Sequence, residues 1–186
     1  MKMKQQMKSH LRTISLTAIL LFAFFATTTY FSCKKDSCKS VACANGGVCT
    51  DGKCVCPSGY EGNYCETVNR DRYLGSWNVA EKGTITNEAQ YTISVEKGDN
   101  ILELRIKNLR NLFTQDVHGW VKTDTVYIPQ QTINSIYSVV GNGIITDDKH
   151  FGDRGKLIVR YQVTDLTTGL VDDFGYAAGD SSVWHK

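Results

Sequence analysis

Six cysteines lie within 28 residues of this chain, and this density constrains its fold more than any other feature. They are Cys38, Cys43, Cys49, Cys54, Cys56 and Cys65. A segment of fewer than about 40 residues cannot bury a sufficient apolar core, so disulfides or a metal ion must stabilise it. The choice between the two depends on the compartment in which the chain folds.

The first 32 residues have the pattern of an export signal. Residues 2–12 are basic and contain no acid, and residues 14–26 form an apolar run that only Ser15 and Thr17 interrupt. A membrane-spanning helix needs about 20 apolar residues, so this shorter run favours a signal peptide over an uncleaved anchor. We therefore predict a signal peptide over residues 1–32 and folding in an oxidising compartment.

Disulfides are the better explanation of the six cysteines. An exported chain meets oxidising conditions, and the segment contains neither a Cys-x2-Cys pair nor a neighbouring histidine for zinc. Spacing alone leaves fifteen possible pairings of six cysteines. We expect three disulfides and no metal ion.

The mature chain has a nearly neutral charge. Removing residues 1–32 takes away four of the 21 basic residues and leaves 17 basic against 19 acidic residues. No long basic run remains, so the electrostatic pattern of nucleic-acid binding is missing. We expect no nucleic-acid partner.

The cysteine segment resembles an EGF-like domain. The resemblance covers residues 38–66 and is carried by the runs CANGGVC and CVCPSGYEGNYCE. Only four residues separate Cys49 from Cys54, as in the compact, tenascin-like kind. The resemblance implies the pairs Cys38–Cys49, Cys43–Cys54 and Cys56–Cys65, and a role as a rigid spacer or a protein-recognition surface. The ligands of the calcium-binding subtype are not assembled, so we expect no calcium.

Cys33 accounts for the seventh, unpaired cysteine. The small residue Ser32 directly before it resembles the lipobox of bacterial lipoproteins, and the following Lys34-Lys35-Asp36 resembles the tether of outer-membrane lipoproteins. The resemblance implies that Cys33 becomes the first residue and carries acyl chains such as palmitate, with residues 33–37 as a tether. We therefore expect a lipid-anchored protein of the outer membrane, on either its periplasmic or its surface side. A free or intermolecular thiol is the alternative.

A second domain begins after a linker at residues 67–72. Residues 73–186 contain no cysteine, and apolar residues alternate with polar ones, as in Tyr91, Ile93 and Val95. We expect strands at 76–80, 91–95, 102–106, 117–121, 125–128, 136–140, 157–163 and 171–176, with turns at 97–100, 141–143 and 165–169. No convincing helix occurs. The fold class is therefore all-β, with about eight antiparallel strands in a barrel or, alternatively, a sandwich.

The opening Gly75-Ser76-Trp77 of this domain resembles the first strand of lipocalins, streptavidin-like proteins and related up-and-down barrels. The resemblance implies that Trp77 plugs the base of a barrel and that the cation of Arg160 packs over it. An eight-stranded barrel is either filled or lined around one small ligand. The candidate lining residues, which could equally be plain core, are Tyr91, Trp120, Tyr127, Tyr137, Tyr161 and Phe174.

No pattern in the chain indicates catalysis. Nucleophile elbows, Walker loops and dinucleotide fingerprints are absent. The best polar cluster is residues 147–153, where Asp147, Asp148 and Asp153 surround His150, and a solvated hairpin loop is its favoured interpretation. We expect a non-enzymatic binding module without a cofactor, whose barrel takes a small apolar ligand or a protein partner. The alternatives are an adhesion protein with a filled barrel and, more weakly, a metal-assisted enzyme that uses His150.

Overall fold

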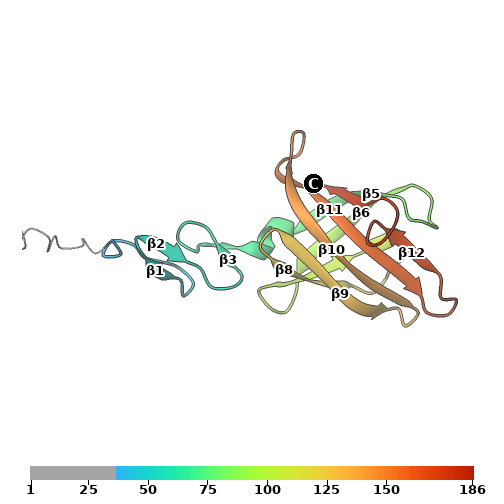
Figure 1. The fold of residues 1–186 in the computed structure, drawn as a ribbon, viewed down its shortest axis with the longest axis horizontal. Helices are drawn as coiled ribbons and strands as arrows, with labels where there is room; N and C mark the ends of the chain where they lie inside the picture. Colours follow the sequence, from blue (N-terminus) through green and yellow to red (C-terminus); the bar gives the residue numbers. More distant parts are fainter. Residues whose placement is uncertain (1–36) are drawn as a thin grey trace, which may run out of the picture. The chain divides into compact units, whose positions relative to one another are not determined.

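The computed structural model describes residues 37–186, shown in colour in Figure 1. The predicted signal peptide and Cys33 lie outside the described residues. Contacts divide the chain into one unit of residues 1–40 and a second of residues 41–186. Of the first unit, the structure describes residues 37–40, which form a turn. The second unit contains most of the cysteine-rich module and the whole of the second domain.

The cysteine-rich module consists of two small hairpins. Strand β1 (Val48–Thr50) pairs with β2 (Lys53–Val55), and β3 (Tyr60–Glu61) pairs with β4 (Thr67–Val68). Disulfides join Cys43 to Cys54 and Cys56 to Cys65, with Cα atoms 5.6 and 5.2 Å apart. Cys38 and Cys49 are disulfide-bonded as well. The two bridges Cys43–Cys54 and Cys56–Cys65 are pairs that the EGF-like resemblance implies.

Eight antiparallel strands close into a barrel in the second domain. They are β5 (Gly75–Glu81), β6 (Ala89–Lys97), β7 (Glu103–Lys107), β8 (Val117–Lys122), β9 (Thr125–Ile133), β10 (Tyr137–Asp148), β11 (Gly152–Asp165) and β13 (Ser182–His185). Neighbouring strands pair in chain order from β5 to β11, and β13 pairs with both β11 and β5 (Figure 1). The all-β prediction is confirmed, and the closed ring decides for a barrel over a sandwich.

The eighth strand of the ring differs from the predicted one. The segment predicted at 171–176 forms β12 (Val171–Phe174), which pairs with residues 162–164 of β11 but does not reach β5. The irregular loop of residues 175–181 follows, and β13 then takes the next position along the same edge of β11. The last edge is therefore shared by two short strands, each only four residues long.

The turn predicted at 141–143 is wrong, because these residues lie within the long strand β10. Gly141 is buried and lies opposite Tyr161 of β11. A Cβ atom at Gly141 would come within 2.4 Å of the Cβ atom of Tyr161. Glycine is needed here for close approach inside the barrel and not for a turn.

The segment predicted as a linker at 67–72 is also ordered. It forms β4 and most of a 3-10 helix, η1 (Asn69–Tyr73), whose Arg72 and Tyr73 are buried. A second short 3-10 helix, η2 (Leu109–Asn111), follows β7. Within residues 37–186, no helix has the length and apolar character needed to cross a membrane.

Candidate functional site

Trp77 belongs to the buried core of the barrel and lies near the start of β5. It is fully buried, and its indole N–H donates a hydrogen bond of 2.7 Å to the carbonyl oxygen of Tyr73 in η1. Gly75 joins η1 to β5 with a φ of 113°, a conformation that residues with side chains rarely adopt. In the Gly-x-Trp pattern, Gly75 thus allows the turn and Trp77 fills part of the core.

The cation over Trp77 comes from Lys186 and not from Arg160. The Nζ atom of Lys186 lies 5.0 Å from the centre of the Trp77 ring, and burial lowers the pKa of this amine. Arg160 is exposed because it lies between Val159 and Tyr161, which both point into the barrel. Alternation along β11 therefore directs Arg160 outward, and the prediction of an Arg160–Trp77 contact was wrong.

A buried hydrogen-bond network surrounds the carboxyl group of Glu81 inside the barrel. Its Oε1 accepts from the hydroxyl of Tyr91 at 2.7 Å, and its Oε2 accepts from the hydroxyls of Tyr161 at 2.8 Å and Ser182 at 2.6 Å. The indole of Trp184 donates to the Ser182 hydroxyl at 2.8 Å. Burial raises the pKa of Tyr161, and the nearby Tyr91 and Glu81 raise it further, so its hydroxyl remains a donor. Every polar group of this network is satisfied within the protein.

Phe174 of β12 extends this interior toward η2. Its ring stacks on that of Tyr161 with centroids 4.5 Å apart, and the guanidinium of Arg110 lies 4.8 Å from the Phe174 ring. Asp172 holds Arg110 by an ion pair of 2.5 Å. Burial alone would raise the pKa of Asp172, but hydrogen bonds from Thr86, Ile85 and Arg110 outweigh it and lower the pKa.

The interior of the barrel is therefore filled by its own side chains. The buried apolar residues that form this core are 0 to 5% exposed, from Trp77 and Val159 at 0% to Ile145 at 5%. Of the six candidate lining residues, Tyr161 and Phe174 are buried, and Tyr91 and Tyr137 pack against the core from its margin. Trp120 and Tyr127 are exposed instead, so the prediction that they line the interior was wrong.

The loop of residues 147–153 caps its own backbone. The Oδ1 atom of Asp148 accepts hydrogen bonds from the backbone N–H groups of His150 and Phe151, and these lower the pKa of Asp148. Asp147 accepts likewise from the N–H of Arg154 at 2.9 Å. In the part of the chain that the structure describes, no group of three or more His, Cys, Asp or Glu side chains is placed to hold a metal ion. His150 and the carboxylates of this loop therefore do not form such a group.

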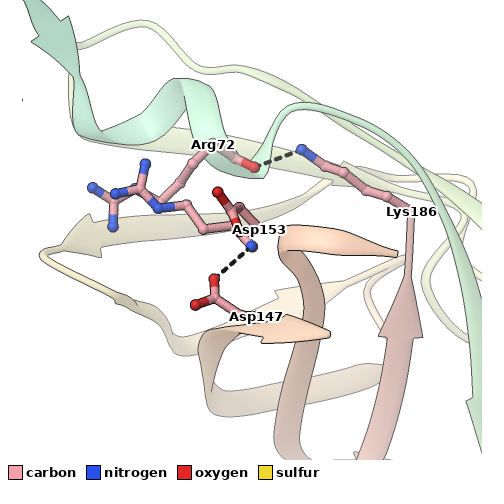
Figure 2. Close-up of a pocket in the computed structure, with 5 residues that line it drawn as sticks. Arg72, Asp147, Asp153 and Lys186 are labelled. Carbon is pink, nitrogen blue, oxygen red and sulfur yellow. Dashed lines mark hydrogen bonds between the residues drawn. The ribbon is translucent and has the colours of Figure 1, made fainter. Parts of the chain in front are cut away.

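A polar hollow of about 630 Å³ lies beside this loop (Figure 2). It is lined by Arg72, Asp147, Asp153, Arg154 and Lys186. Figure 2 shows the Nζ atom of Lys186 bonded to the carbonyl oxygen of Arg72, at 2.7 Å, and Asp147 bonded to the backbone of the hairpin. Most charged groups around the hollow are thus already bonded to other parts of the chain.

Glu61 connects the cysteine-rich module to the barrel through two arginines. One carboxylate oxygen forms an ion pair with Arg72 of η1, and the other lies 3.3 Å from Nη1 of Arg154 in β11. Arg72 also binds Asp124, in the turn between β8 and β9, and its side chain is only 4% exposed. Burial and the neighbouring Arg154 lower the pKa of Arg72. Glu61 of the module therefore binds two arginines, which η1 and β11 position.

Backbone contacts support the same junction. The N–H of Asn69 donates to the carbonyl oxygen of Gly59 at 2.9 Å, and the buried Gly59 packs against Ile101 and Leu102 after β6. Arg70 donates to carbonyl oxygens of the same turn, including that of Glu103 at 3.3 Å. The module and the barrel thus share a packed, hydrogen-bonded contact in place of a free linker.

Replacing Glu61 with glutamine is expected to lower the free energy of unfolding by about 2 kcal/mol, because it leaves the buried charge of Arg72 with one acid in place of two. Hydrogen exchange of residues 59–73 should become faster. The exposed Glu88, which forms no ion pair within the described residues, provides the matched control Glu88→Gln. Equal stability of the two variants in urea would contradict a role for Glu61 at the junction.

Glu61, Arg72, Glu81 and Lys186 did not emerge from the sequence as functional candidates. One signal was present for Glu81, because it continues the inward alternation of Trp77 and Val79 and so places an acid at a core position. No comparable signal pointed to Glu61, Arg72 or Lys186, whose roles depend on contacts between distant segments.

Comparison with known proteins bears on both parts of the chain. Residues 40–68 match a family model described as a teneurin-like EGF domain. The chain is also similar to Fibropellin-3 of Strongylocentrotus purpuratus, with 31% identity over 105 residues. This alignment covers 52% of the chain and 17% of Fibropellin-3. The chain thus contains a teneurin-like EGF module that is followed by a closed eight-stranded β-barrel.

Proposed function

We propose that this chain is a lipid-anchored, non-enzymatic binding protein of the outer membrane that recognises another protein through its outer surface. The filled interior of the barrel carries this proposal. A small-molecule pocket needs about 300 Å³ or more of largely apolar space. The core side chains of the barrel, at 0 to 5% exposure, occupy that space themselves, which directs binding to the outside.

The EGF-like module supports a role in protein recognition outside the cytosol. Its similarity to teneurin-like EGF domains relates it to extracellular protein-interaction modules. The Glu61 junction joins it firmly to the barrel, which suits a spacer that presents the barrel to a partner.

The lipid anchor rests on the amino-terminal sequence. A basic start, an apolar run of 13 residues and Ser32-Cys33 follow one another, and removing Cys33 leaves an even number of cysteines for disulfides. Each buried methylene of an acyl chain contributes about 0.8 kcal/mol to membrane binding, so several chains would hold the protein stably.

Replacing Cys33 with serine is expected to release the protein from the membrane fraction, because the side chain that would carry the acyl chains is lost. Mass spectrometry of the mature wild-type chain should find acyl chains on an amino-terminal Cys33. The variant Ser37→Ala, which keeps Cys33, should remain in the membrane fraction. An unmodified terminus produced by cleavage elsewhere would refute the anchor.

Native mass spectrometry of the delipidated protein from its own membrane tests the binding proposal. A bound polypeptide that dissociates at high salt is the expected result, since protein surfaces of opposite charge separate under screening. A retained small-molecule mass would contradict a filled barrel that binds proteins, and so would detection of the bare chain alone after mild extraction.

A further inference from the structure

The outer face of the barrel carries a cluster of large apolar side chains on three neighbouring strands. Trp120 of β8 lies directly opposite Tyr127 of β9, and Ile144 of β10 lies opposite Thr125, two residues along the strand from Asn142, which faces Tyr127. Their side chains are 38, 49 and 41% exposed. We name Trp120, Tyr127 and Ile144 the aromatic patch. Outward positions on the barrel are normally polar, so this clustering indicates a surface that is covered in use.

The composition of the aromatic patch matches that of protein-binding surfaces. Tryptophan and tyrosine, together with arginine, are the residues that most often dominate the binding energy of protein interfaces. Trp120 is also unlike the other two tryptophans, since Trp77 and Trp184 are buried in the core. Burial therefore explains Trp77 and Trp184, whereas Trp120 has no structural role in the core.

Positive charge surrounds the aromatic patch. Arg160 and Lys156 lie on β11 opposite Asn142 and Thr146 of β10, and Lys122 lies opposite Thr125 at the end of β8. None of these three cations forms a salt bridge within residues 37–186. The outward cations farther along the sheet do have acids, as in the pair of Lys107 with Glu96 at 2.8 Å. Glu103, which lies opposite Trp120, is already bound to His118 at 2.7 Å.

We infer that the aromatic patch, together with Lys122 and Arg160, docks an acidic, apolar segment of a partner protein. This inference rests on the proposed function and specifies its binding surface. Charge complementarity favours an acidic partner, because the unpaired cations raise the rate and specificity of its association. A second copy of this chain is disfavoured, since a two-fold interface would bring two copies of the same cationic surface together.

A membrane surface fits the aromatic patch less well than a protein does. Trp120, Tyr127 and Ile144 lie within strands, and about half or more of each side chain is covered by its neighbours. Anchors that enter the acyl region of a membrane present an apolar face that is free to penetrate about 5–10 Å. The patch instead offers a flat apolar surface with a cationic rim, which suits a folded or extended acidic polypeptide.

Trp120 provides a direct optical test on the full mature chain. The probe is a synthetic peptide in which Asp and Glu alternate with Tyr and Ile, and its counterpart replaces the acids with Lys. The acidic peptide should protect tryptophan fluorescence from quenching by acrylamide, because Trp120 is the exposed tryptophan. The Lys peptide should give no protection, and salt should weaken binding of the acidic peptide.

Two variants and two controls identify the surface. Trp120→Ala and Arg160→Glu should each weaken binding of the fluorescently labelled acidic peptide about tenfold or more, the scale on which interface anchors act. The exposed residues Tyr176 and Lys149 provide the controls Tyr176→Ala and Lys149→Glu, which should bind like the wild type. Circular dichroism and thermal unfolding establish that each variant is folded.

The remaining outcomes separate the inference from the proposed function. Unchanged peptide binding in folded Trp120→Ala and Arg160→Glu would overturn the docking surface, while a polypeptide retained in native mass spectrometry would still support the proposed function. If phosphatidylglycerol vesicles protected tryptophan fluorescence from acrylamide and the acidic peptide did not, the aromatic patch would be assigned to a membrane. Dimers that Trp120→Ala abolishes would assign it to a second copy, and either result refutes the inference.

Discussion

Replacing Trp77 with alanine is expected to lower the free energy of unfolding by about 3–5 kcal/mol, the range for removing a large aromatic side chain from a core. Trp77 is fully buried in the core of the barrel. The substitution also leaves the carbonyl oxygen of Tyr73 without its indole donor and removes the ring beneath Lys186. Small domains are stable by only about 5–15 kcal/mol, so the variant should be close to unfolding.

Urea unfolding followed by circular dichroism measures this effect without relying on tryptophan fluorescence. Trp77→Phe separates the two contributions, since it keeps much of the buried volume and loses the N–H donor. It should therefore be destabilised less than Trp77→Ala. A loss below about 1 kcal/mol for Trp77→Ala would show that the base of the barrel collapses around the vacancy or is not packed as described.

Replacing Glu81 with alanine is expected to destabilise the barrel by a similar amount, on the order of 3–5 kcal/mol, for a different reason. The hydroxyls of Tyr91, Tyr161 and Ser182 would lose their shared acceptor. Each buried donor left without a partner costs about 1–3 kcal/mol. Glu81→Gln should cost less, because its amide oxygen still accepts a hydrogen bond.

A double-mutant cycle tests whether Glu81 acts through these hydroxyls. In the Glu81→Ala background, Tyr161→Phe should cost less than it does in the wild type, because the hydroxyl that it removes is already unpaired. The exposed variant Glu88→Ala should leave stability nearly unchanged and serves as the control. Additive effects of Glu81→Ala and Tyr161→Phe in urea unfolding would refute the network.

The β-strands could be predicted wherever alternation of side chains was regular. Trp77 and Val79 in β5, and Ile93 and Val95 in β6, alternate with outward residues as predicted, because one face of each strand is buried. The predictions failed at Gly141 and at β13 (Ser182–His185). A glycine pair suits a turn and a close approach equally well, and four residues are too few to show a period.

The candidate site could be predicted only in part, because parity within a strand gives the direction of a side chain but not its contact partner. Side-chain parity along β8 and β11 places Trp120 and Arg160 outward, since each lies between two buried residues, but the predictions placed Trp120 inside the barrel and Arg160 over Trp77. The resemblance of Gly75-Ser76-Trp77 to lipocalin-like barrels led to a different partner for Trp77. The cation over the Trp77 ring belongs to Lys186, whose position depends on how the last strand closes the ring.

The amino-acid sequence by itself determined the cysteine-rich module and the all-β character of the second domain, because both follow from spacing between near neighbours in the chain. Tertiary structure alone decided that the barrel is filled, that Glu61 binds Arg72 and Arg154, and that aromatic and cationic side chains share one outer face. Glu81 and Ser182 illustrate the reason, since they are 101 residues apart and meet only after β13 has paired with β5. Contacts of this kind depend on closure of the ring, which no local pattern encodes.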